Sequence, residues 1–181
     1  MTSWKLVQKA RDILRKESGT VYKSWGGKIS ICLIYPNSYH VGMSNLGFQT
    51  LYQLLNSEDD VICERAFLPD SEDHQEYHKT QTPLFDFLNL LTLLDLAHIP
   101  MESSLRRNRY PLVIAGGVAV FLNPEPVSDL FDLFIFGEAE EVIKEFLEVC
   151  RSIFSEKGRT EKDAFLRQLA GIEGIYIPKF Y

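Results

Sequence analysis

Residues 29–47 read ISICLIYPNSYHVGMSNLG, and this stretch decides the fold. Its first part, residues 29–35, is a β-branched and apolar run closed by a proline and an asparagine, which predicts a strand buried on both faces. Gly42 and Gly47 then bracket a turn, and apolar side chains recur at helical spacing over residues 48–55. A strand, a glycine turn and a helix in this order predict the opening of a βαβ unit.

The rest of the chain continues the alternation of helices and strands. The runs at 112–115 and 133–136 are short and apolar, and each ends in glycine, as expected for strands that enter tight turns. The alternation predicts an α/β protein with an open parallel sheet and helices on both faces. In chain order we expect a helix outside the sheet at 4–17, a strand at 61–67, helices at 88–97, 139–154 and about 161–169, and an edge strand or exit segment at 174–178.

The composition suits one globular domain, and the net charge argues against polyanionic partners. With 181 residues and 45% apolar content, the chain can bury one sizeable core, and its length favours one domain over two. A net charge of −6, with no basic cluster beyond residues 106–109, makes nucleic acid and anionic membranes unexpected partners. No apolar run reaches the ~18 residues that span a bilayer. The first residues lack an apolar signal core, so we expect a cytoplasmic protein.

The three cysteines, Cys32, Cys63 and Cys150, are odd in number and irregular in spacing. They predict reduced, mostly buried thiols, because a disulfide framework or a metal cluster needs paired or closely spaced cysteines.

Glycines mark three strand ends where a ligand could bind. They lie in residues 36–47, at Gly116 and Gly117, and at Gly137 with Glu138. Ligands of open parallel sheets bind beyond the carboxyl ends of the strands, where glycine lets the backbone approach them closely. The alternative is that all three are ordinary tight βα turns.

Several other polar residues each have a functional and a structural interpretation. His74 and His78 have the spacing of metal ligands on a helix, but no third ligand accompanies them, so we expect a polar surface segment. Glu138, Glu140 and Glu141 resemble an acid/base group, yet stabilisation of a helix amino terminus explains them.

Two further features could present a functional group at the surface. Glu125 lies between two prolines in a rigid loop, where it could contact a ligand or a following domain. Aromatic residues near the two ends of the chain could mark a docking surface, namely Trp4, Trp25, Tyr176 and Phe180. No catalytic triad, phosphate loop or Gly-x-Gly-x-x-Gly motif occurs, and we predict no catalytic centre in this chain.

Seven short motifs occur in an order that resembles a known family. They are YPNSYHVGMSNLG (35–47), ERAFLP (64–69), LDLA (94–97), PLVIAGG (111–117), NPEP (123–126), GEAEE (137–141) and GIYIP (174–178). The set resembles the amino-terminal, cobalamin-binding-like domain of a bacterial family of radical SAM proteins.

The resemblance implies a flavodoxin-like (Rossmann-like) domain at residues 29–181, preceded by a helix and linker at 1–28. It also implies a radical SAM barrel after residue 181. That barrel would bind an iron–sulfur cluster through three closely spaced cysteines and would cleave S-adenosylmethionine. Since no such cysteine triplet occurs here, the resemblance assigns both functions to the parent protein and not to this chain.

The chain departs from the cobalamin-binding pattern in two places. Where many such domains have Asp-x-His-x-x-Gly, with histidine ligating cobalt and aspartate orienting it, this sequence has Asn37, Tyr39 and Gly42. His40 is displaced by one residue and should point the other way. A strand with a Ser-x-Leu signature is missing or shortened near residues 82–89. Ser44 begins a Ser-Asn-Leu sequence that we interpret as helix capping.

Three interpretations remain open on sequence grounds. The first is a non-catalytic cobalamin-binding module with a site lined by Asn37, Tyr39, Gly42, Ser44, Gly116, Gly117, Gly137 and Glu138. The second is a degenerate domain that serves as a structural or protein-interaction element, and the third is a flavodoxin-like domain that binds a flavin or another nucleotide. Partners would be the downstream radical SAM domain and a second copy of the chain, which could pair with an exposed sheet edge.

Overall fold

The computed structural model describes residues 4–68, 86–121, 123–155 and 161–181. It shows a mixed α/β protein whose chain divides into two compact units, Met1–Asp86 and Phe87–Tyr181. Each unit has its own small sheet, and each is described by itself. The expected domain boundaries, 1–28 and 29–181, stay a prediction.

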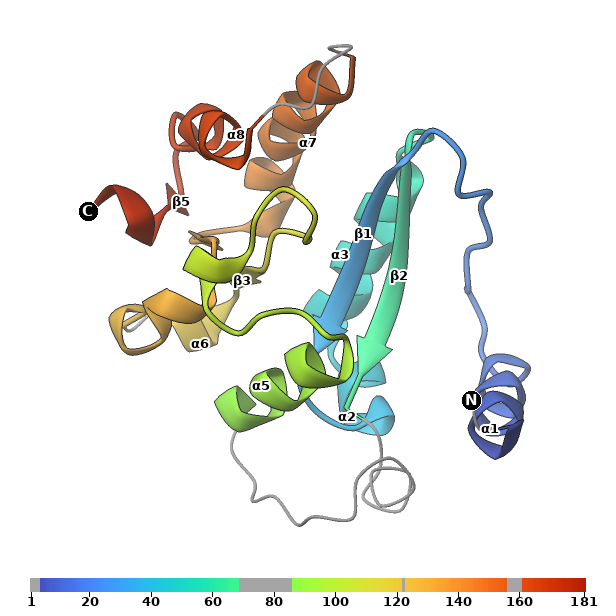
Figure 1. The fold of residues 1–181 in the computed structure, drawn as a ribbon. Helices are drawn as coiled ribbons and strands as arrows, with labels where there is room; N and C mark the ends of the chain where they lie inside the picture. Colours follow the sequence, from blue (N-terminus) through green and yellow to red (C-terminus); the bar gives the residue numbers. More distant parts are fainter. Residues whose placement is uncertain (1–3, 69–85, 122, 156–160) are drawn as a thin grey trace. The chain divides into compact units, whose positions relative to one another are not determined.

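The first unit contains the predicted βαβ motif (Figure 1). Strands β1 (Ile29–Tyr35) and β2 (Val61–Phe67) are parallel, and α3 (Leu46–Ser57) connects them. Helix α3 buries Phe48, Tyr52 and Leu55, the residues whose spacing predicted it. Two shorter elements precede it, α1 (Trp4–Leu14) and α2 (Tyr39–Met43).

Strand β1 is not buried on both faces, and this expectation was wrong. Ile29 is buried, whereas Ser30, Cys32 and Ile34 are exposed. The physical reason is present in the run itself, because its alternate positions carry a serine and a cysteine, which tolerate water better than isoleucine does. Of the three cysteines, Cys63 and Cys150 are buried, and all three are free thiols, as predicted.

The outer edge of β2 is closed by side chains. The bond from the Ile29 amide to the Asp60 carbonyl fixes the parallel ladder, so the N–H and C=O of Cys63 point away from β1. The buried amide of Asn56 takes both groups: its Nδ2 donates to the Cys63 carbonyl (3.0 Å) and its Oδ1 accepts from the Cys63 N–H (3.1 Å). Lys23 Nζ covers the Val61 carbonyl at 2.9 Å. At these positions a second copy of the chain would find no free backbone group to pair with.

The second unit contains a three-stranded sheet in the order β3–β4–β5. Strands β3 (Ile114–Gly116) and β4 (Leu133–Ile135) are parallel. Strand β5 (Ile175–Tyr176) lies at the edge of the sheet, which agrees with the first of the two expectations for this segment, an edge strand or an exit segment. However, β5 runs antiparallel to β4, so the expected all-parallel sheet was wrong at this edge. Two helices, α7 (Ala139–Ser155) and α8 (Lys162–Leu169), lie between β4 and β5. Such a pair of helices carries the chain out and back, so β5 starts at the end of the sheet where β4 finishes.

The remaining elements of the second unit are short, apart from α5 (Asp86–Leu96). They are η1 (Ser103–Leu105), α6 (Val118–Phe121), η2 (Glu125–Leu130) and η3 (Pro178–Phe180). Of the region expected to be shortened, residues 82–85 lie outside the described residues, and residues 86–89 belong to α5. Helix α5 ends before Pro100, because His98 takes a left-handed φ of +54°.

A buried arginine holds the second unit together. Arg106 and Asp132 form an ion pair (Nε–Oδ2, 3.1 Å) with side chains that are 0% and 1% exposed. The remaining guanidinium donors bind the carbonyls of Pro100, Met101 and Leu130 at 2.7–2.8 Å. Lys162 of α8 pairs with the second oxygen of Asp132. One charge cluster therefore connects α8, the residue that precedes β4 and the loop after α5.

The role of Asn56 can be tested by stability. Asn56→Ala leaves the N–H and C=O of Cys63 buried without partners, and we expect it to lower the free energy of unfolding by about 2–6 kcal/mol, because each of the two orphaned groups costs about 1–3 kcal/mol. Urea denaturation of both proteins measures the loss. Ser57→Ala, at the exposed neighbouring position, is the matched control, and an equal loss in both variants would contradict this role.

Candidate functional site

Asn37 and Ser44, predicted to line a cofactor site, bond instead to backbone groups of other residues of the first unit. Asn37 Oδ1 accepts from the Ser38 N–H at 2.7 Å, and its carbonyl accepts from the Leu68 N–H at 2.9 Å. Ser44 ends α2, and its Oγ donates to the Val41 carbonyl at 2.8 Å. Asn45 caps α3 by accepting from the Phe48 N–H, which confirms the helix-capping interpretation.

Tyr39, at the position of the cobalt ligand, is held by its hydroxyl and by its ring. The hydroxyl donates to Glu17 Oε1 at 2.8 Å. The ring meets Phe67 and His40 edge-on, with centroids 5.3 and 5.4 Å away. Burial, reinforced by the hydrogen bond to the Glu17 carboxylate, raises the pKa of Tyr39 to about 12. The phenol is therefore neutral, and its hydroxyl is already engaged by Glu17.

The other half of the Glu17 carboxylate binds Arg65 of β2. Arg65 NH2 lies 2.5 Å from Glu17 Oε2, with side chains 9% and 6% exposed. Arg65 NH1 donates to Gln49 Oε1 at 3.1 Å, and the guanidinium lies 4.1 Å from the centre of the Tyr52 ring. The sequence interpretation missed this group. The sequence did contain a signal for this group. Arg65 lies on the same face of β2 as Val61, because alternate residues of a strand share a face, and a charged side chain among apolar ones needs a partner.

Residues 17–28, which we call the strap, contact the βαβ motif through a few polar bonds. Besides Glu17, the Val21 N–H donates to the Tyr52 hydroxyl at 3.0 Å, and Lys23 Nζ donates to the Glu58 carbonyl at 2.6 Å. Much of the strap is exposed, including Tyr22 at 80% and Trp25 at 58%. The strap thus depends on specific bonds more than on apolar burial.

Gly42, the third predicted site residue, is required by packing. A Cβ at this position would lie 2.5 Å from Cε1 of Phe67 and 3.1 Å from the Cβ of Tyr35. The missing side chain therefore lets α2 approach the ends of β1 and β2, and the space is filled by the protein itself.

The other four predicted residues lie at or just after the ends of β3 and β4 in the second unit. Gly116 lies opposite Ile135 in the parallel ladder, so Gly117 and Gly137 follow neighbouring strand ends. Both take left-handed φ values, +89° and +94°, and the position of a Cβ is open at each. The carbonyl of the exposed Glu138 accepts from the Glu141 N–H at 3.3 Å.

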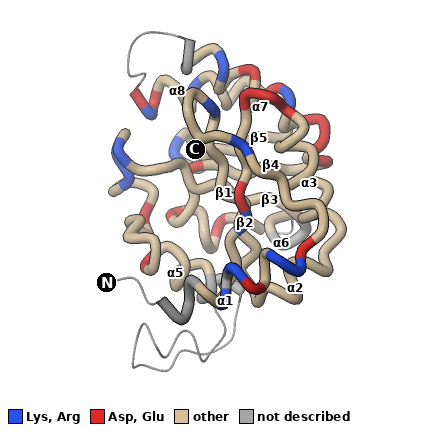
Figure 2. The backbone as a smooth tube through the Cα atoms, turned by 90° about the vertical axis from the view of Figure 1, so that its right-hand side faces the viewer, with Lys and Arg blue, Asp and Glu red and all other residues tan. Residues whose placement is uncertain are grey.

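The structure thus brings the predicted residues together in two sets, one in each unit. Asn37, Tyr39, Gly42 and Ser44 lie within α2 or within two residues of its ends, and the second set lies at the carboxyl ends of β3 and β4. As expected, Glu140 and Glu141 are in the first turn of α7, the helix along which acidic residues gather in Figure 2.

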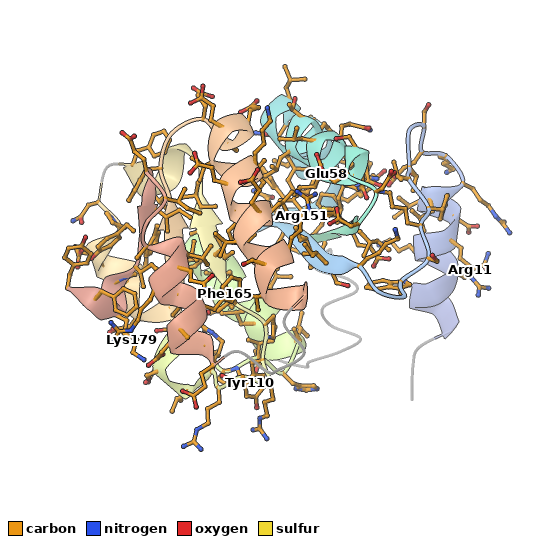
Figure 3. All side chains as sticks on the ribbon, turned by 90° about the horizontal axis from the view of Figure 1, so that it is seen from above. Arg11, Glu58, Tyr110, Arg151, Phe165 and Lys179 are labelled. Carbon is orange, nitrogen blue, oxygen red and sulfur yellow. The ribbon has the colours of Figure 1, made fainter. Side chains whose placement is uncertain are left out.

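Of the remaining candidates, Glu125 and Tyr176 bond to each other although they are 51 residues apart in the chain. Tyr176 donates to Glu125 Oε1 at 2.6 Å, and this bond raises the pKa of Tyr176. Lys179, labelled in Figure 3, pairs with Asp163 of α8. His74 and His78 lie outside the described residues. Among those described, no group of three His, Cys, Asp or Glu side chains could hold a metal ion, and no helix is long and apolar enough to cross a membrane.

Substitution of Gly42 tests the packing explanation. Gly42→Ala forces a methyl group against Phe67, and we expect it to destabilise the protein by about 1–3 kcal/mol, as overpacking does. Thermal unfolding measures the change. The control is Gly26→Ala, where the same methyl group meets open space. Equal melting temperatures in the two variants would contradict the packing role.

The pH dependence of stability tests the state of Tyr39. Its folded pKa of about 12 lies above the value of ~10 for an unfolded tyrosine. The neutral phenol therefore stabilises the fold fully below pH ~10, and this contribution is lost as the pH rises toward 12. Urea denaturation of the wild type and Tyr39→Phe should show their stability difference shrinking across that window. A constant difference would mean that Tyr39 has an ordinary pKa.

Comparisons with known proteins support the resemblance to amino-terminal regions of radical SAM proteins, and they do not extend to cobalamin binding. The profile of the family described as "Radical SAM proteins, N-terminal" matches residues 47–87 and 84–178. An uncharacterized protein of Methanocaldococcus jannaschii is 27% identical over 115 residues, which are 61% of this chain and 24% of that protein. The chain thus spans about a quarter of the length of this curated relative. No solved structure matches. By the extent of the profile match, the chain belongs to the family of amino-terminal regions of radical SAM proteins.

Proposed function

We propose that this amino-terminal module serves its radical SAM protein as a structural and interaction element, and that it does not ligate cobalt. The observation that carries the proposal is the bond from Tyr39 to Glu17 (2.8 Å), which occupies the side chain at the ligand position. This is the second of the three interpretations open on sequence grounds.

The residues present do not fit a histidine-ligated cobalamin. Histidine ligation of cobalt needs an imidazole nitrogen with a free lone pair, and the expected aspartate would orient that imidazole. Tyr39 is a neutral phenol bonded to a carboxylate, and Asn37 accepts from its own loop. His40 is exposed and places its ring against Tyr39, so its use as a ligand would disturb the same contacts.

A second candidate is a corrinoid or a flavin held without a protein ligand. The observation that favours it is the pair of left-handed turns at Gly117 and Gly137, both open at the position of a Cβ. The strand neighbours within each unit, β2–β1 and β3–β4–β5, are also those of the flavodoxin-like order 2-1-3-4-5. We infer a flavodoxin-like fold on this basis, with β5 reversed.

The partner implied by the family is the radical SAM domain of the parent protein. Iron–sulfur cluster binding and cleavage of S-adenosylmethionine would belong to that domain. The module would contribute a docking surface or a ligand to the parent enzyme.

A binding experiment separates the candidates. The purified chain is mixed with hydroxocobalamin, adenosylcobalamin or flavin mononucleotide and passed over a gel-filtration column, and the absorbance of the protein peak is recorded. We expect no ligand to co-elute, while circular dichroism shows folded protein.

Three variants give the experiment its controls: Gly137→Ala, Gly26→Ala and Tyr39→Phe. Gly137→Ala fills an open left-handed turn, and Gly26→Ala places the same methyl group in open space. Co-elution with the wild type that is lost only in Gly137→Ala would establish the second candidate. Co-elution that is lost only in Tyr39→Phe would mean that Tyr39 contacts the ligand, and the proposal would be wrong.

A further inference from the structure

The carboxylate of Glu17 lies among donors from three directions. Its Oε1 accepts from the Tyr39 hydroxyl at 2.8 Å, and its Oε2 accepts from Arg65 NH2 at 2.5 Å and from the Thr20 hydroxyl at 2.8 Å. Only 6% of the Glu17 side chain is exposed, so the carboxylate is nearly buried and both of its oxygens accept hydrogen bonds, as those of an anionic ligand do in a binding site.

The two donors outside the strap are fixed by groups other than Glu17. Arg65 is held by Gln49 Oε1 at 3.1 Å, by the sulfur of Met43 at 3.2 Å and by the face of the Tyr52 ring. Tyr39 is held by the edge-on contact of its ring with Phe67. Removal of Glu17 would leave these contacts in place, so the donors form a preorganised cradle.

The cradle needs an anion. The Arg65 side chain is only 9% exposed, and a guanidinium at such depth is costly without a counter-charge. In the described structure Glu17 supplies that charge from a strap whose other residues are largely exposed.

We propose that Arg65 and Tyr39 form a carboxylate-binding site that Glu17 fills in cis. The ligand class is a carboxylate, presented here by the strap and available equally from a small carboxylic acid or an acidic side chain of a partner. Guanidinium and hydroxyl donors address its two oxygens separately, which is why a carboxylate suits the site. The proposal does not depend on whether a corrinoid binds elsewhere.

Chemical rescue tests this site in the full chain. Glu17→Ala removes a CH₂–COO⁻ group, and acetate is the molecule that replaces it. In this variant we expect acetate to raise the melting temperature in a saturable way, by about 3–6 °C at ten times its Kd, relative to chloride at equal ionic strength. The melting temperature of the wild type should respond to acetate and chloride alike, because acetate that exchanges with Glu17 makes no additional contact in a cradle that is already full.

Two controls locate the effect. Glu17→Ala combined with Arg65→Gln should show no acetate response, because the charged donor is gone. Asp12→Ala removes an exposed carboxylate nearby, one bound to Arg15 on the surface, and should also show none. A Glu17→Ala protein that is folded and responds equally to acetate and chloride overturns the proposal, as does a response that survives Arg65→Gln.

The wild type decides the matter if Glu17→Ala folds in neither salt. Acetate at about 1 M, well above the mM effective concentration of a group on a short flexible tether, should displace Glu17 and expose the strap to trypsin. Cleavage after Lys23 should then increase relative to cleavage after Lys144 of α7. An equal ratio in acetate and chloride overturns the proposal.

Discussion

Each unit of this protein is organised around an arginine that has been taken out of water. Arg65 in the first unit and Arg106 in the second are largely or fully buried, and each is paired with one carboxylate. Removing a guanidinium from water costs several kcal/mol, so its partners must be in place for the unit to be stable. This requirement selects the surroundings: carbonyls and Asp132 around Arg106, and Glu17, Gln49 and the Tyr52 ring around Arg65.

The regular elements could be predicted because their information is local. The spacing of Phe48, Tyr52 and Leu55 shows one face of α3, and the apolar residues at both ends of 61–67 indicate a strand. The reversed direction of β5 could not be predicted in this way. It depends on how α7 and α8 return the chain to the sheet, which no residue of β5 encodes.

The candidate site was predictable in part for the same reason. That Asn37 and Tyr39 replace a ligand and its orienting group is visible in the sequence, because a motif has fixed spacing. What Tyr39 does instead depends on Glu17, which lies 22 residues away. Arg106 shows the limit most clearly, since it belongs to a short basic run that suggests a solvated surface, yet its side chain is 0% exposed. Partnerships formed between distant residues leave no local pattern.

The bond between Asn56 and the backbone of Cys63 has a consequence for the chemical ageing of the protein. Asparagine side chains hydrolyse slowly to aspartate, and at this position the change would replace a donor by an oxygen facing the Cys63 carbonyl. The two acceptors would repel each other at a buried edge. Position 56 therefore tolerates an amide and not an acid. Its burial at the end of α3 also slows the hydrolysis, because a helical backbone keeps the Ser57 nitrogen away from the side-chain carbon that it would have to attack.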